Sequence, residues 1–109
     1  MINFIRMRLL LFIILLFPFL APAQTPELIF VFLNKRTDKA ELPEAELKKI
    51  MDGHMANIER LAGEGKLISA GPFDGGGGIF IFRSSSRDQV KEWLQTDPGV
   101  QANRWRVEV

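Results

Sequence analysis

The lone histidine of this 109-residue chain, His54, is its best candidate for chemistry, because an imidazole exchanges protons near neutral pH. Counting about 100° per residue along the segment GHMANIERL places His54 at the centre of an apolar helical stripe. The other members of that stripe are Leu47, Ile50, Met51, Ile58, Leu61 and Ala62. A buried ring needs hydrogen-bond partners for its nitrogens. With a carboxylate as one partner, His54 would be a general base or acid.

Asp74 is the acidic residue that we expect to orient the ring, because it directly follows Gly71-Pro72-Phe73 at the end of a predicted strand. Ser69, on that strand, could also hydrogen-bond the ring. Each residue has a structural alternative. A histidine on an apolar face is often a satisfied core residue, and Asp-Gly is common in turns. The sequence leaves both readings open.

Other kinds of site have less support. One histidine, with no cysteine and no clustered second ligand, argues against a protein zinc site. The glycine run 75–78 leads into a strand and lacks a following Lys-Ser/Thr, so it does not match a phosphate-binding loop. We interpret it as a lid or a plain hairpin loop. We therefore expect no metal and no cofactor.

Residues 1–23 have the features of a cleaved signal peptide. Two arginines precede the apolar run 9–20, which is too short to cross a bilayer core of about 30 Å, and Ala21-Pro22-Ala23 forms an A-x-A cleavage site. We expect Sec-type export, to the periplasm or the exterior, of a single domain spanning residues 24–109.

The composition of the mature domain excludes some partners. Cleavage removes two of the 14 basic residues and none of the 13 acidic ones, which leaves a formal net charge of −1. Nucleic acids and anionic membranes are bound by concentrated basic surfaces, so we expect the mature domain to bind neither. Without cysteine, the domain must be stabilised by its hydrophobic core.

The hydrophobic pattern predicts four strands and two helices. In order, we expect a strand at 28–33, a helix at 43–62, strands at 66–73 and 79–82, a helix capped by Ser86 and stopped at Asp97-Pro98-Gly99, and a strand at 104–109. The first and third strands are apolar at successive positions, as in strands buried on both faces. The last strand alternates apolar and polar residues, which is typical of one buried face.

This β-α-β-β-α-β order predicts an α+β, ferredoxin-like fold in which the first and third strands are central. Both helices would then cover one face of the sheet. The apolar side chains on the other face would have no partner within one chain. We therefore expect a homodimer with its sheets face to face, a dimeric α+β barrel, and a small cavity between sheet and helix or at the subunit boundary.

Three ordered motifs make residues 27–109 resemble the YCII-related proteins, which are small dimeric α+β barrels. They are His54 within GHMANIERLAGEGKL, Ala70-Gly71-Pro72 after the second strand, and Asp97-Pro98 after the second helix. The resemblance implies an active-site dyad of the helix histidine and an acidic residue, here His54 and Asp74.

The same resemblance suggests where a substrate would bind and what reaction would occur. Gly71, Pro72 and Asp97, with Ser69, are the candidate substrate-binding residues. Some YCII-related proteins resemble lyases that remove chloride from chlorinated aromatic products, and the fold is shared with muconolactone isomerases. We therefore predict a small exported protein whose His-Asp site acts on a small cyclic or aromatic molecule, as a lyase or isomerase. The alternative is a non-catalytic dimeric domain for ligand binding or assembly.

Three positions depart from the YCII-related pattern. Met51 replaces a basic residue that often stands three positions before the histidine. The loop after Gly71-Pro72 is shortened to a glycine run, and Gly99 stands where an aromatic residue is common. The first change removes an anion-holding group and the others alter the pocket wall, so the substrate class does not transfer.

Overall fold

The computed structural model describes residues 27–109, so the expected signal peptide lies outside the described residues. The elements in chain order are β1 (Leu28–Lys35), α2 (Glu44–Gly63), β2 (Leu67–Pro72), β3 (Gly78–Arg83), α3 (Arg87–Leu94), α4 (Pro98–Gln101) and β4 (Trp105–Glu108). The four predicted strands and both predicted helices are present, and α4 is an addition. None of the helices in residues 27–109 combines the length and the hydrophobicity of a membrane-spanning segment.

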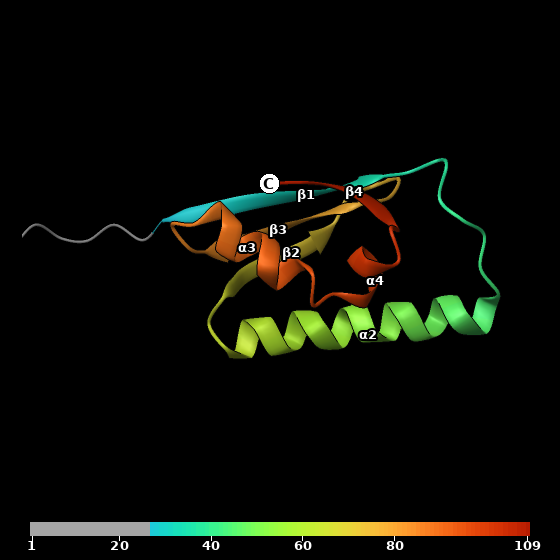
Figure 1. The fold of residues 1–109 in the computed structure, drawn as a ribbon, viewed down its shortest axis with the longest axis horizontal. Coiled ribbons are helices and arrows are strands. Elements are labelled where there is room, and N and C mark those ends of the chain that lie inside the picture. The colour runs from blue at the N-terminus through green and yellow to red at the C-terminus, as the bar shows by residue number, and fades with distance from the viewer. Residues whose placement is uncertain (1–26) are drawn as a thin grey trace, which may run out of the picture.

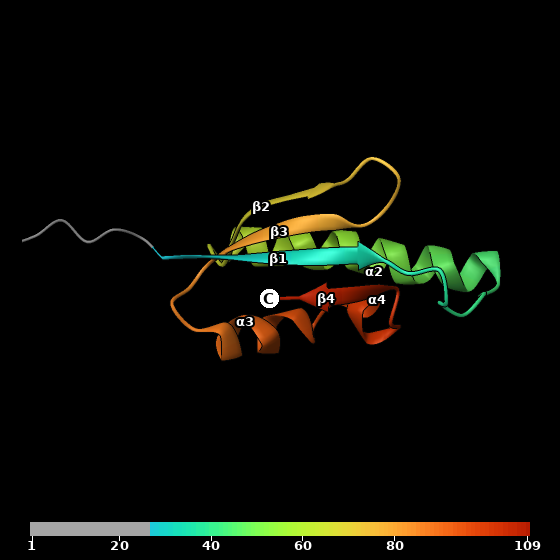
Figure 2. The same ribbon diagram turned by 90° about the horizontal axis from the view of Figure 1, so that it is seen from above.

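The four strands form one antiparallel sheet in the order β2-β3-β1-β4. Figure 2 shows β1 and β3 in the middle of this sheet, with β2 and β4 at its edges. We predicted that the first and third strands, which are apolar at successive positions, would be central, and the strand order confirms this. The arrangement is the expected α+β, ferredoxin-like one.

All the helices lie on one side of the sheet (Figure 1). The hydrophobic core fills the space between them and consists of Val31, Leu33, Leu61, Leu67, Phe80, Phe82, Val90 and Leu94. On β1 the alternate side chains Leu28, Phe30 and Phe32 are exposed, and Phe30 is 51% exposed. The sheet thus has an open apolar face that no described element covers.

Helix α2 presents His54, Asn57 and Leu61 to the interior as its buried residues. Ala62, which we expected in the same stripe, is exposed. Around the helix axis, the buried residues of α2 are centred about 50° away from the centre of the predicted stripe, toward Asn57. Because of this rotation, Ala62 points away from the sheet. His54 is buried, as predicted.

The helix caps confirm one sequence signal and correct another. Ser86 caps α3, since its side chain accepts a hydrogen bond from the backbone N–H of Gln89, 3.2 Å away. Asp97-Pro98-Gly99 does not merely stop that helix. It begins α4, with Asp97 as the N-cap and Pro98 at the first position, where the lack of an N–H does no harm.

Candidate active site

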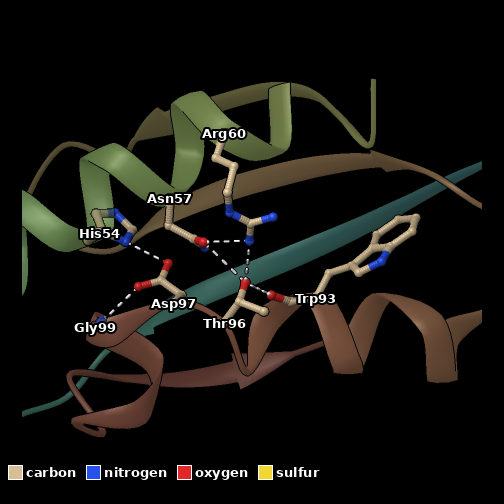
Figure 3. A network of polar contacts seen from close by, with 7 residues as sticks. All are labelled: His54, Asn57, Arg60, Trp93, Thr96, Asp97 and Gly99. Atoms are coloured by element: carbon tan, nitrogen blue, oxygen red, sulfur yellow. Dashed lines mark hydrogen bonds and ion pairs between the residues drawn. The ribbon is translucent and has the colours of Figure 1, made fainter. Parts of the chain in front are cut away.

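His54 on α2 contacts the carboxylate of Asp97, the residue that caps α4 (Figure 3). The distance from His54 Nδ1 to Asp97 Oδ2 is 2.7 Å. Both residues are buried, at 7% and 1% exposure respectively. The buried carboxylate is satisfied on its other side as well, because Asp97 Oδ1 accepts the backbone N–H of Gly99 at 2.7 Å.

Two glycines permit this contact by letting α4 pack closely. A Cβ on Gly53, one residue before His54, would lie 2.9 Å from Pro98 Cγ. A Cβ on Gly99 would lie 2.5 Å from Cζ3 of Trp105. The first glycine brings α4 against α2, and the second leaves room for the indole, so the departure at Gly99 has a structural reason.

The Asp97 contact defines which nitrogen of the ring carries a proton. A carboxylate accepts hydrogen bonds, so in neutral His54 the hydrogen is on Nδ1 and the lone pair is on Nε2. Nε2 has no hydrogen-bond partner among residues 27–109, and His54 lines a cavity beside α2. The lone pair of Nε2 is therefore free to accept a proton.

Two aromatic side chains fix the plane of the imidazole. The ring centroid of His54 lies 4.8 Å from that of Trp105, with the rings tilted. It lies 5.9 Å from that of Phe80, with the rings stacked. The packing against β3 and β4 and the hydrogen bond to Asp97 thus orient the ring through groups of the chain itself.

The cavity has a volume of about 460 Å³ and lies between α2 and the sheet. Its lining comprises Leu33, Met51, His54, Met55, Ile58, Ala70, Gly71, Pro72, Gly77, Gly78, Phe80 and Trp105. His54 is the single ionisable side chain among these residues. Met51 contributes an apolar part of the wall.

The end of the β2-β3 hairpin forms one side of the cavity through backbone rather than side chains. Gly77 has φ +77°, and a Cβ there would overlap the carbonyl oxygen of Leu33. A Cβ on Gly78 would lie 2.6 Å from the carbonyl oxygen of Gly71. The N–H of Phe73 donates to the Gly77 carbonyl at 3.0 Å, which closes the turn. The glycine run is a hairpin turn that passes tightly against β1.

The structure separates the candidate residues into three groups. Gly71 and Pro72 line the cavity. Ser69 pairs with Ile81 and is exposed, so it lies outside the cavity. Asp74 is exposed in the hairpin turn and does not orient His54, which corrects that expectation. Asp97, expected to touch substrate, lies behind the ring and takes the place that we assigned to Asp74.

The sequence contains a signal that Asp97, and not Asp74, has a fixed position. Asp97 directly before Pro98 is the pattern of an N-cap followed by a proline at the first helical position. That pattern indicates a helix start at Asp97 and hence a fixed, buried carboxylate. The partner is 43 residues away from His54 in the chain, so only the packing of α4 on α2 identifies it.

Comparisons with known proteins support the fold and the family. The family model of the YCII-related domain matches residues 28–109. No curated protein matches the chain. One similar solved structure is 5-chloro-2-hydroxyhydroquinone dehydrochlorinase from Burkholderia phenoliruptrix in complex with 2,5-dihydroxybenzoquinone. It is 22% identical, with a TM-score of 0.54, and the match covers 76% of this chain and 92% of that chain. Because the family model spans most of its length, this chain belongs to the YCII-related domain family.

Proposed function

We propose that this protein is an acid/base enzyme in which Nε2 of His54 exchanges a proton with a small ring-shaped organic molecule. The observation that carries the proposal is the buried 2.7 Å contact between Asp97 and Nδ1 of His54, at the wall of an apolar cavity. The contact keeps the hydrogen on Nδ1 and so leaves Nε2 as a base. When Nε2 takes a proton, the carboxylate stabilises the resulting imidazolium.

Two reaction types fit such a base. In a lyase reaction, Nε2 removes a proton, the electron pair of the broken bond forms a new double bond, and a leaving group departs with its own electron pair. In an isomerase reaction, the imidazolium returns the proton to a different atom of the same molecule. Either reaction uses only groups of the chain, and proton transfer of this kind contributes about 10² to 10⁴ in rate.

The cavity limits the class of substrate. Its lining is apolar apart from His54 and backbone groups, so a permanently charged substrate would lose its hydration without compensation. A volume of about 460 Å³ lies within the usual range for small-molecule sites. The similar dehydrochlorinase was solved with a single-ring hydroxylated quinone. We therefore propose a single-ring substrate without a permanently charged group, such as a hydroxylated or chlorinated hydroquinone, a quinone or a lactone.

A panel of such compounds tests the proposal. Wild type should convert at least one member, and His54→Ala should lose that activity while remaining folded. Asp74→Asn is the matched control, because this exposed carboxylate lies outside the cavity and its variant should retain wild-type activity. Equal turnover by wild type and His54→Ala would contradict the proposal. Binding without turnover by wild type would instead favour the non-catalytic ligand-binding alternative.

We also propose that a second copy of this chain covers the open face of the sheet. Leu28, Phe30 and Phe32 are exposed there, and Phe73 extends the apolar surface by stacking on Phe32 with ring centroids 6.4 Å apart. Two copies of one apolar face can bury each other around a two-fold axis. Sedimentation should give a dimer for wild type at micromolar concentration and a monomer for Phe30→Lys. A wild-type monomer under those conditions would refute this.

We further propose export of the chain, on the basis of the order of charged, apolar and small residues in 1–23. Expression of the full-length chain in a bacterium should yield a periplasmic or extracellular product whose first residue is Gln24. Recovery of the uncut chain from the cytosol would contradict this expectation.

A further inference from the structure

A second polar cluster joins α2 to the segment that carries Asp97, one helical turn away from His54 (Figure 3). Its members are Asn57 and Arg60 on α2 and Thr96 in the connection between α3 and α4. Arg60 Nη2 lies 2.9 Å from Asn57 Oδ1 and 3.0 Å from Thr96 Oγ1. We call these three residues the clasp.

Hydrogen-bond donors and acceptors in the clasp can be matched one by one. The Thr96 hydroxyl has one hydrogen, and its oxygen lies 2.5 Å from the Trp93 carbonyl oxygen and 3.1 Å from Asn57 Oδ1. Donation to the closer Trp93 carbonyl ties Thr96 to the end of α3. The two hydrogens of Arg60 Nη2 can then serve Asn57 Oδ1 and Thr96 Oγ1 at once. The guanidinium group thus bridges two acceptors from different segments.

Asn57 shows a feature that packing alone does not explain. It is 8% exposed, and its Nδ2 is buried without a hydrogen-bond partner among residues 27–109. An unpaired buried donor destabilises a fold, and an apolar side chain of similar size would avoid that penalty. The amide at this position is explained by its oxygen, which accepts a hydrogen bond from Arg60 Nη2.

The clasp restrains the chain segment that carries the Asp97 carboxylate. Helix α3 ends at Leu94 and α4 begins at Pro98, which leaves a short connection that contains Thr96 and Asp97. After Asp97, the cap to Gly99 fixes the chain. Before it, Arg60 donates to the Thr96 hydroxyl and so ties Thr96 to α2, the helix that also carries His54. Asp97 is therefore restrained from both sides relative to the imidazole.

We propose that Asn57, Arg60 and Thr96 are positioning residues that hold the Asp97 carboxylate against Nδ1 of His54. The proposal deepens the proposed function and rests on it for its use in catalysis. The positioning itself is a property of the free protein. It can therefore be measured without a substrate.

The test compares two substitutions at Thr96, one that keeps the shape of the side chain and one that keeps its hydroxyl. Thr96→Val keeps the shape but removes the hydroxyl, whereas Thr96→Ser keeps the hydroxyl. The readout is the pair of ring ¹⁵N signals of His54 in the full chain, recorded by long-range ¹H–¹⁵N NMR. Wild type and Thr96→Ser should show one tautomer, with the hydrogen on Nδ1. Thr96→Val should show both tautomers, with the two nitrogen signals shifted toward their average.

A second variant keeps the proposal testable if Thr96→Val does not fold. Arg60→Met removes the bridge from the solvent-exposed end of the clasp and should produce the same averaging. If Thr96→Val and Arg60→Met both keep the single Nδ1–H tautomer of wild type, the positioning role is overturned. Failure to find any turnover in the substrate panel would refute the proposed function and leave this NMR result standing. Once a substrate is known, Thr96→Val should lower kcat at least about 10-fold with little change in KM.

Discussion

Gly53 is the point at which a single methyl group should disturb the candidate site. A Cβ at this position would lie 2.9 Å from Pro98 Cγ and 3.4 Å from Pro98 Cβ. Ordinary carbon–carbon contacts are about 3.5 to 4.0 Å, so Gly53→Ala should displace α4 by about 0.6 Å. If α4 moves as a unit, the 2.7 Å contact between His54 and Asp97 lengthens to about 3.3 Å, past the usual limit of a hydrogen bond.

The energetic expectation has two opposing parts. Overpacking costs about 1 to 3 kcal/mol, while alanine is favoured over glycine inside a helix by up to about 1 kcal/mol. Gly53→Ala should therefore destabilise the fold by up to about 2 kcal/mol. Gly63→Ala is the matched control on the same helix, because nothing lies within 4 Å of its added methyl group. That variant should be neutral or stabilising.

Urea unfolding and the ¹⁵N signals of His54 measure both effects. The expected result is a lower unfolding free energy and a mixture of ring tautomers for Gly53→Ala, with neither change in Gly63→Ala. If Gly53→Ala is as stable as Gly63→Ala and keeps the single tautomer, the close packing of α4 does not position Asp97, and the reasoning is refuted.

Three further substitutions give sharp expectations. Asp97→Asn should move the hydrogen of His54 to Nε2 and lower any turnover by about 10² to 10⁴, and an unchanged rate would contradict the dyad. The pKa of Glu64 lies below its ordinary 4.5, chiefly because Lys66 hydrogen-bonds its carboxylate. The ionised carboxylate therefore stabilises the folded state fully above pH 4.5, and this stabilisation is lost as pH falls through the lowered pKa. The unfolding free energies of wild type and Glu64→Gln should therefore converge in acid, and a persisting gap would count against this. Gly77→Ala should destabilise by more than about 1 to 2 kcal/mol in urea, because φ is +77° and the methyl group would meet the β1 backbone, whereas a neutral effect would refute that explanation.

The sheet could be predicted from the sequence because its signals are local and repeated. The segments 28–33 and 79–82 are apolar at successive positions, and both became central strands. The alternation of Trp105, Val107 and Val109 placed one face of the last strand in the core, and these residues do pack there. The period of the pattern therefore indicates strand position without knowledge of distant contacts, although one face of β1, with Phe30 and Phe32, is exposed in the single chain.

The partner of His54 could not be predicted in the same way. Asp74 is closer in the chain and follows a strand, but it is exposed in a hairpin turn. Asp97 reaches the ring because a four-residue helix packs against α2 at a glycine. A helix of that length has no hydrophobic period to detect, and the close approach at Gly53 is a tertiary contact. The clasp residues Asn57 and Thr96 are polar, and local pattern gives them no special weight.

The most direct test of the central claim is the exchange of hydrogen for deuterium in a bound ring compound. Hydroxylated quinones and lactones from the substrate panel would be incubated in D₂O with wild type or His54→Ala and followed by ¹H NMR. Wild type should accelerate loss of a carbon-bound hydrogen signal by about 10² to 10⁴ over His54→Ala for at least one compound. Equal exchange rates with both proteins across the panel would contradict the role of His54 as the base.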